Sequence, residues 1–203
     1  MRWFDDHPPG VVDVATFLAF CGSSRKDSFN QKTLDCVVNA LQAKGETVKV
    51  ISLSDFKQPI YNGDEESANG LPEATVRLQT LLHEHDALLI GCPEYNGFMT
   101  PLLINTIDWT TRSCKATPDL SCFAGKPVLI TCSSPGPGGG MRAATHLKTM
   151  LLGIGCVVSP DNFMVPSAFN AFDDSGKLKD EKLRQRAEQV ALRFRELTIK
   201  LLS

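Results

Sequence analysis

Five short apolar runs alternate with segments of helical spacing, and this alternation constrains the fold more than any other feature of the sequence. The runs are VATFLAFC, ETVKVISL, DALLIGC, KPVLITC and GCVVSPDNFMV, and most are rich in the β-branched residues that favour strands. Helical spacing is found at residues 30–44, 72–83, 100–112, 141–152 and 179–202. Strands that are joined by helical crossovers run parallel and are buried on both faces. The sequence therefore predicts an α/β fold.

The expected architecture is a three-layer α/β/α sandwich around a five-stranded parallel sheet with the order 2-1-3-4-5. We expect one domain over residues 15–203, preceded by a loose N-terminal extension at residues 1–14. That extension contains two prolines and no long apolar core, so it lacks the pattern of a secretory signal peptide. Two polar stretches, residues 59–70 and 169–176, are predicted to be connecting loops.

Charge and cysteine usage restrict the class of partner. The chain carries 21 basic and 23 acidic side chains, a formal net charge of -2, which gives no field for steering nucleic acid or an anionic membrane surface. No run reaches the roughly 20 apolar residues that cross a bilayer. The seven cysteines stand mostly in apolar contexts and are predicted to be reduced thiols. These features favour a cytoplasmic protein with a small-molecule partner.

Three loops should converge where a ligand binds, because ligands of such folds sit outside the carboxyl ends of the strands. They are GSSRKDSFN, PEYNGFMTP and SSPGPGGGMR. In the first loop Ser23, Ser24 and Ser28 supply hydroxyls, Arg25 supplies a cation, and a helix begins at Asn30, a combination that suits a phosphate monoester. The alternative is a serine-rich turn whose hydroxyls only cap the helix.

Three rival phosphate motifs are absent. The sequence contains no G-x-x-x-x-G-K-[ST] loop, and GPGGGM has Met141 where a dinucleotide fingerprint needs its third glycine. In a cysteine phosphatase of the low-molecular-weight type, five residues separate the cysteine from an arginine. Counted from Cys21, that arginine position is occupied by Asp27. Cys21 is therefore predicted to be the apolar end of a strand, although a nucleophilic thiol remains the alternative.

The second and third loops offer surfaces for a flat heterocycle. Tyr95 supplies an aromatic face and Asn96 an amide, while glycines such as Gly136 let the backbone approach a ligand closely. An ordinary turn and a bare linker are the alternatives for these two loops. The four histidines are not spaced as metal ligands, and no metal is predicted.

Together the three loops resemble the NADPH-dependent FMN reductase family of flavodoxin-like proteins, which includes quinone, azo-dye and chromate reductases. GSSRKDSFN matches its pattern G-S-x-R-x-x-S-x-N, and SSPGPGGG matches S-x-P-G-x-x-G-G within one position. PEYNGFMTPLLINTIDW matches its P-E-Y-N and T-P-L-L-K-N-x-x-D-W segments, except that Ile104 replaces a lysine and Phe98 stands where a small hydroxyl residue is usual. The resemblance spans roughly Thr16 to Val165.

The resemblance implies a flavodoxin-like fold, FMN as cofactor and NADPH or NADH as electron donor. The reaction would pass two electrons to a small-molecule acceptor such as a quinone, an azo compound, a metal ion or free flavin by a ping-pong route, without a catalytic side chain. A flavodoxin-like carrier or a non-catalytic flavin-binding module is the alternative. Family members assemble as homodimers or homotetramers. The residues expected to bind FMN are Ser23, Arg25, Ser28, Asn30, Pro93, Glu94, Tyr95, Asn96, Gly97, Ser133, Ser134 and Gly136.

Overall fold

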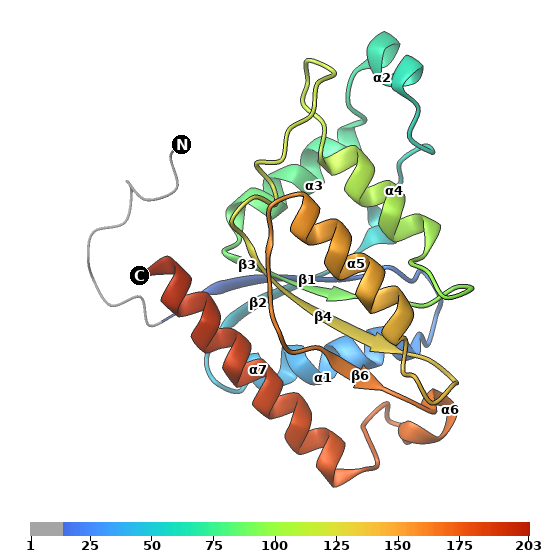
Figure 1. The fold of residues 1–203 in the computed structure, drawn as a ribbon, viewed down its shortest axis with the longest axis vertical. Coiled ribbons are helices and arrows are strands. Elements are labelled where there is room, and N and C mark those ends of the chain that lie inside the picture. Colours follow the sequence, from blue (N-terminus) through green and yellow to red (C-terminus); the bar gives the residue numbers. More distant parts are fainter. Residues whose placement is uncertain (1–13) are drawn as a thin grey trace.

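The structure of the protein is a computed structural model that describes residues 14–203, so that all but the last residue of the predicted N-terminal extension lies outside the described residues. A parallel sheet forms the centre and helices cover both of its faces (Figure 1). The strands are β1 (Thr16–Cys21), β2 (Thr47–Ser52), β3 (Ala87–Gly91), β4 (Pro127–Ser133), β5 (Val157–Val158) and β6 (Phe163–Val165). Their order is β2-β1-β3-β4-β5, with β6 also paired to β4. The predicted α/β class and strand order are confirmed.

The helices fall close to the segments that helical spacing predicted. They are α1 (Phe29–Gln42), α2 (Gly63–Asn69), α3 (Glu73–Glu84), α4 (Pro101–Thr110), α5 (Met141–Gly153), α6 (Ala168–Ala171) and α7 (Glu181–Leu202), with a 3-10 turn η1 at Leu53–Asp55. Side-chain caps define several starts, for example Ser28 before α1 and Thr100 before α4. The short helices α2 and α6 lie in the two stretches that the sequence predicted as loops.

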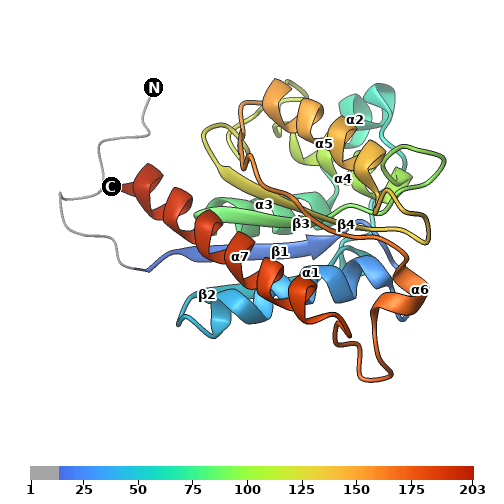
Figure 2. The ribbon, with the colours of Figure 1, turned by 60° about the horizontal axis from the view of Figure 1, so that its bottom comes forward.

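Two apolar cores lie on opposite faces of the sheet. Alternate residues of β1 divide between them, with Leu18 and Phe20 on one face and Phe17 and Ala19 on the other. The first core is closed by α3, α4 and α5, and the second by α1 and α7. Figure 2 shows α1 and α7 on one side of the sheet and α4 and α5 on the other, which is the predicted three-layer sandwich.

The fifth position of the sheet is filled by two short strands rather than one. β5 pairs with β4 at Pro127 and Val128, whereas β6 pairs at residues 131–133. Four residues, SPDN at 159–162, stand opposite only two residues of β4, and Pro160 among them has no backbone N–H to donate. The interruption turns the chain outward before β6 brings it back to the carboxyl-end edge, next to the three loops.

None of the helices within residues 14–203 is both long and apolar enough to cross a membrane. Over the same residues no cluster of three or more histidine, cysteine and acidic side chains is placed to hold a metal ion.

Candidate functional site

The first loop is pressed against the start of α4. A methyl group added at Gly22 would lie 2.9 Å from Leu103 Cβ and 3.0 Å from Thr100 Oγ1, so only glycine fits at this position. Thr100 Oγ1 donates to the Gly22 carbonyl at 2.6 Å. Ser28 then caps α1, its hydroxyl accepting from the Gln31 N–H at 3.4 Å. The loop is therefore anchored at both ends, while its serine and arginine side chains face the carboxyl-end edge of the sheet.

Arg25 differs from the other arginines near the site because it has no carboxylate partner. Within the described residues no ion pair includes Arg25, whereas Arg142 pairs with Glu94 and Arg112 with Glu66. Its side chain lines a pocket together with Ser23 and Ser28. An unpaired guanidinium beside two hydroxyls and the positive end of α1 is suited to an anion such as a phosphate.

The second loop is a tight two-residue turn. Tyr95 and Phe98 exchange both backbone hydrogen bonds, at 2.9 and 3.0 Å, and the two residues between them have φ values of 54° (Asn96) and 81° (Gly97). Positive φ at both central positions is the pattern of a type I′ turn, which asparagine and glycine favour. Tyr95 and Phe98 remain 46% and 43% exposed, so the turn presents two aromatic rings near the pocket.

Asn30 joins the first loop to the third. Its Oδ1 accepts from the Ser133 N–H at 2.8 Å and its Nδ2 donates to the Ser133 carbonyl at 3.0 Å. The hydroxyl of Ser133 in turn donates to the Val165 carbonyl at 2.9 Å. Both side chains were predicted to contact a cofactor, but in this structure their polar atoms hold α1, β4 and β6 together at the edge of the pocket.

Glu94 connects the second loop to the start of α5. Its Oε1 accepts from the Arg142 Nε at 3.0 Å and from the Arg142 Nη2 at 2.6 Å, and its Oε2 accepts from the Ala143 N–H at 3.3 Å. Burial opposes ionisation of this carboxyl, but the bonds from Arg142 and Ala143 outweigh it and hold the pKa of Glu94 below its usual range. The guanidinium also lies close to Gly97, so the ion pair braces the Asn96–Gly97 turn.

We expect Glu94→Gln to weaken the fold modestly and in a pH-dependent way. Because Arg142 is 71% exposed at its side chain, the loss at pH 7 should be about 0.5–1 kcal/mol. The pKa of Glu94 is lowered in the folded state, so its contribution is complete above the pKa of an unfolded glutamate, about 4.3, and declines as the pH falls through the folded pKa. Urea unfolding of both proteins should show the difference at pH 7 and its loss near pH 3. A difference of equal size at both values would contradict this.

The last two glycines of the third loop lie close to neighbouring strands β4 and β6. Gly139 and Gly140 have φ values of 59° and 89°, and a methyl group at Gly140 would lie 2.9 Å from Cys132 Cβ. Gly140 precedes α5 directly. By contrast, an added methyl at Gly138 meets nothing within 4 Å, so this part of the loop is open. The glycines thus let the chain turn closely over the end of β4.

The structure brings most of the predicted site residues to one pocket. From the predicted set, the lining contains Ser23, Arg25, Ser28, Asn30, Pro93, Glu94, Tyr95, Ser133 and Ser134. Asn96, Gly97 and Gly136 belong to the same loops but are not part of the lining. Four further residues line it that sequence reasoning missed, namely Phe29, Pro135, Ala168 and Phe169. The first two are neighbours of predicted residues, whereas Ala168 and Phe169 belong to α6, which the sequence predicted as a linker.

Cys21 is the last residue of β1 and only 2% exposed. Burial raises the pKa of its thiol to about 12, although bonds from Ser23 and Ser28 act in the opposite direction. A thiol with this pKa is almost entirely protonated at neutral pH and is a poor nucleophile. The geometry therefore supports the interpretation of Cys21 as the end of a strand.

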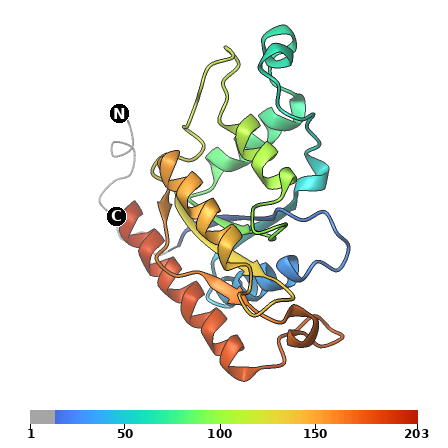
Figure 3. The ribbon, with the colours of Figure 1, turned by 45° about the vertical axis from the view of Figure 1, so that its right-hand side comes forward.

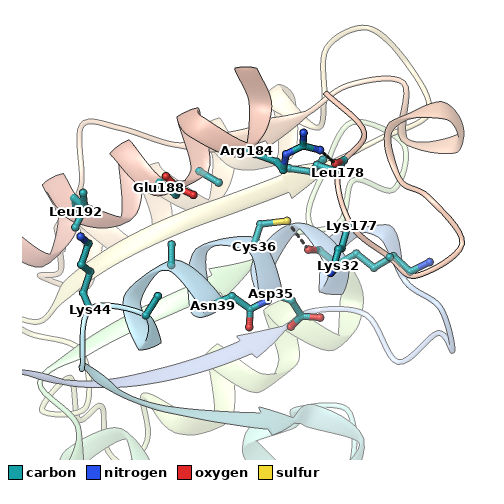
Figure 4. A pocket seen from close by; sticks show the side chains of 14 residues that line it. Lys32, Asp35, Cys36, Asn39, Lys44, Lys177, Leu178, Arg184, Glu188 and Leu192 are labelled. Carbon is teal, nitrogen blue, oxygen red and sulfur yellow. Dashed lines mark hydrogen bonds between the residues drawn. The ribbon is translucent and has the colours of Figure 1, made fainter. Parts of the chain in front are cut away.

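A second cavity lies between α1 and α7 (Figure 4). At ≈ 490 Å³ it is larger than the ≈ 90 Å³ pocket between the three loops. Its cations and acids are mixed, and Arg184 is occupied by the Leu178 carbonyl and by Glu181. Its volume alone would suit a ligand, but we assign the site to the smaller pocket. There hydroxyls, an unpaired guanidinium and a helix start converge, and an elongated ligand can extend from it along the open edge.

A parallel sheet in the order 2-1-3-4-5, with its loops gathered at the carboxyl-end edge, defines a flavodoxin-like protein. The model of the NADPH-dependent FMN reductase family matches residues 15–170. The chain belongs to this family, and it is an oxidoreductase of the kind that uses FMN and a nicotinamide nucleotide, as the resemblance implied.

Relatives and solved structures agree with this assignment. The chain is 37% identical over 182 residues to an NAD(P)H-dependent FMN reductase of Pseudomonas aeruginosa, covering 88% of this chain and 92% of that protein. It is 33% identical over 173 residues to a quinone reductase of Pseudomonas putida, and the match covers 84% of this chain and 88% of that protein. Among solved structures, the chain is similar to FerB, a flavoenzyme NAD(P)H:(acceptor) oxidoreductase of Paracoccus denitrificans. The TM-score is 0.77 and the sequence identity 29%, and the match covers 92% of this chain and 98% of FerB.

The residues present fit an FMN molecule. A phosphate monoester needs a cation and hydroxyl or N–H donors, which Arg25, Ser23, Ser28 and the start of α1 supply. A flat ring needs an aromatic or apolar surface with polar edges, which the Pro93–Gly97 turn provides next to the first loop. The two requirements are met within one continuous edge of the sheet.

Proposed function

We propose that this protein is an FMN-dependent NAD(P)H oxidoreductase that passes two electrons from a nicotinamide to quinones, azo compounds, metal ions or free flavin. The route is ping-pong, since donor and acceptor would use the same exposed side of the site in turn. The observation that carries the proposal is that Arg25, which has no ion-pair partner within residues 14–203, lines one pocket together with Tyr95 of the second loop.

At the phosphate end we assign binding to Ser23, Arg25 and Ser28, with Asn30 in a positioning role. Arg25 would form charge-assisted hydrogen bonds with the phosphate oxygens, and the serine hydroxyls would donate to them. The dipole of α1, whose first residue follows Ser28, favours the negative charge at the same place. Asn30 supports these groups indirectly, because it fixes α1 to the end of β4.

At the ring end we assign binding to Pro93, Tyr95, Asn96 and Gly97 of the second loop and to Ser134 and Gly136 of the third. Ser133, whose polar groups are engaged by Asn30 and Val165, has a positioning role. The positive φ values of Asn96 and Gly97 form the tight turn that follows Tyr95, which lines the pocket. Backbone N–H groups of these loops would stabilise negative charge that develops at the ring edge during reduction. Glu94 acts through Arg142, since it braces the turn from behind. We assign no catalytic acid or base.

When bound, FMN supplies the redox chemistry, accepting a hydride from the nicotinamide and passing electrons to the acceptor. The protein holds the cofactor, leaves one side of the site open and stabilises charge. Phe98, which replaces a small hydroxyl residue of the family pattern, is 43% exposed and lies 4.5 Å from the His146 ring between centroids. Because it is an exposed aromatic ring in the same turn as Tyr95, we propose it as a determinant of acceptor choice.

Absorption spectroscopy of the purified protein tests the proposal. We expect protein that is isolated with FMN, or loaded with it, to show the flavin bands, and NADPH or NADH to bleach them without oxygen. A quinone should then restore the bands. Bound FMN that neither nucleotide bleaches would instead favour an electron carrier or a non-catalytic module. Protein that takes up no FMN would contradict the proposal as a whole.

We also propose that residues 15–203 form a single FMN-binding domain, that the protein acts in the cytoplasm, and that it assembles as a homodimer or homotetramer. The two continuous cores that share one sheet support the single domain. The seven cysteines are all free thiols and mostly buried, which fits a reducing compartment. Ile104 packs against the first core and is only partly buried, so the α4 surface is available for assembly.

A further inference from the structure

An aromatic ring stands at the rim of the pocket where packing does not require it. Phe169, in the four-residue helix α6, is 70% exposed and lines the pocket with Ser23, Arg25 and Ser28. Figure 3 shows α6 beyond the carboxyl-end edge of the sheet, beside the start of α1. Most of the surface of Phe169 remains exposed in the fold. Ligand pockets combine apolar and aromatic side chains with a few polar groups, so the relevant observation is that this ring lines the pocket and not its exposure alone.

The ring is nevertheless held in a defined position. Phe169 meets Phe29 edge to face, with centroids 5.5 Å apart and planes at 90°, and Phe29 stacks on Phe172 at 5.9 Å and 16°. Phe29 directly follows Ser28, the capping residue of α1. The contact therefore places Phe169 next to the start of α1, the part of the pocket to which we assign the phosphate.

The backbone before Phe169 is fixed to the third loop. Ala168 N–H donates to the Ser134 carbonyl at 3.1 Å, and Ser167 N–H donates to the Gly136 carbonyl at 3.2 Å. Ser167 has a φ of 51°, in the left-handed region, which turns the chain sharply after β6. α6 and the third loop are thus joined, so Phe169 is held relative to both walls of the pocket.

We infer that Phe169 is the apolar wall of the phosphate end of the FMN site and that it strengthens binding by excluding water from the contact between Arg25 and the phosphate. This inference rests on the proposed function. A charge-assisted hydrogen bond is stronger where water is displaced, because the local dielectric constant falls. When FMN binds, the ring of Phe169 would also lose part of its water-exposed surface, and this burial would add to the binding free energy.

The test is a fluorescence titration of FMN and riboflavin against the wild type, Phe169→Ala and Phe169→Leu. We expect Phe169→Ala to raise the dissociation constant of FMN about tenfold, which corresponds to about 1.4 kcal/mol. Phe169→Leu should retain most of the affinity, because it keeps an apolar wall. The effect on riboflavin, which lacks the phosphate, should be clearly smaller than the effect on FMN.

Ile60→Ala is the matched control. Ile60 is 87% exposed and does not line the pocket, so removing its side chain should leave FMN affinity unchanged. Urea unfolding should show nearly the same free energy of unfolding for Phe169→Ala and for the wild type, because an exposed ring contributes little to stability. A loss of FMN affinity in a stable variant is then attributable to the wall.

The outcomes separate this inference from the proposed function. Wild type that binds FMN, together with Phe169→Ala of unchanged affinity, would overturn the role of Phe169 and leave the proposed function standing. An equal loss for riboflavin and FMN would overturn the assignment to the phosphate end. Wild type that binds no FMN would overturn the proposed function itself.

Discussion

Arg25→Ala is expected to reduce FMN affinity by about 10- to 150-fold. The estimate corresponds to the loss of a charge-assisted contact worth about 1.5–3 kcal/mol. The physical reason is that Arg25 is exposed in the first loop, lines the pocket and has no ion-pair partner within residues 14–203. Removing it takes away the only guanidinium that residues 14–203 contribute to the pocket lining, without leaving a buried carboxylate unpaired. Flavin fluorescence titration measures the change directly.

Riboflavin distinguishes a phosphate contact from a general loss of the site. Because riboflavin has no phosphate, its affinity should be nearly the same for Arg25→Ala and for the wild type. Lys26→Ala is the matched control, since Lys26 is the adjacent cation of the same loop, is exposed and does not line the pocket. Unchanged FMN affinity in Arg25→Ala, or an equal loss in Lys26→Ala, would mean that the phosphate does not lie where we propose.

Asn30→Ala is expected to destabilise the fold as well as the site. Its side-chain amide forms hydrogen bonds with both the backbone N–H and the backbone carbonyl of Ser133. Asn30 and Ser133 are only 8% and 2% exposed. Alanine would leave a buried N–H and a buried carbonyl without partners, at a cost of about 1–3 kcal/mol for each group that water does not reach. For a chain of this size each kcal/mol lowers the melting temperature by about 2–4 °C. Urea and thermal unfolding measure the effect.

Asn39→Ala provides the comparison for this result. Asn39 is the same residue type on the same helix but is exposed, so its replacement should change stability by no more than about 0.5 kcal/mol. If Asn30→Ala proved as stable as Asn39→Ala, the two hydrogen bonds to Ser133 would not contribute to the folded state. FMN affinity should also fall in Asn30→Ala, since α1 would no longer be fixed to β4.

The periodic pattern of the chain predicted the sheet well. Strands such as Ala87–Gly91 are buried at every position, because helices cover both faces, and this burial produces the continuous apolar runs seen in the sequence. The fifth strand was predicted as one element, whereas SPDN divides it into β5 and β6. Apolar residues on either side of Pro160 could not show that the chain leaves the sheet and returns.

The convergence of the three loops was predicted from the sequence, whereas the FMN contacts of their residues stay a prediction. Motif residues such as Arg25 and Tyr95 are brought to one pocket as expected, because loops that follow parallel strands meet at one edge. The roles of Asn30 and Glu94 were not evident, since whether an amide or carboxylate faces a ligand or a neighbouring loop depends on contacts over long sequence separations. The contacts between Glu94 and Arg142 span 48 residues, and those between Asn30 and Ser133 span 103.

The sequence by itself determined the fold class, the strand order and the convergence of three loops on one pocket, because these follow from local periodicity and from rules of chain connection. Tertiary structure alone decided which polar atoms remain available. It showed that Asn30, Ser133 and Glu94 are engaged by residues of neighbouring elements, whereas Arg25 has no ion-pair partner within residues 14–203. It also placed Phe169 against Phe29, 140 positions away in the sequence, because the return of β6 to β4 brings α6 to the start of α1.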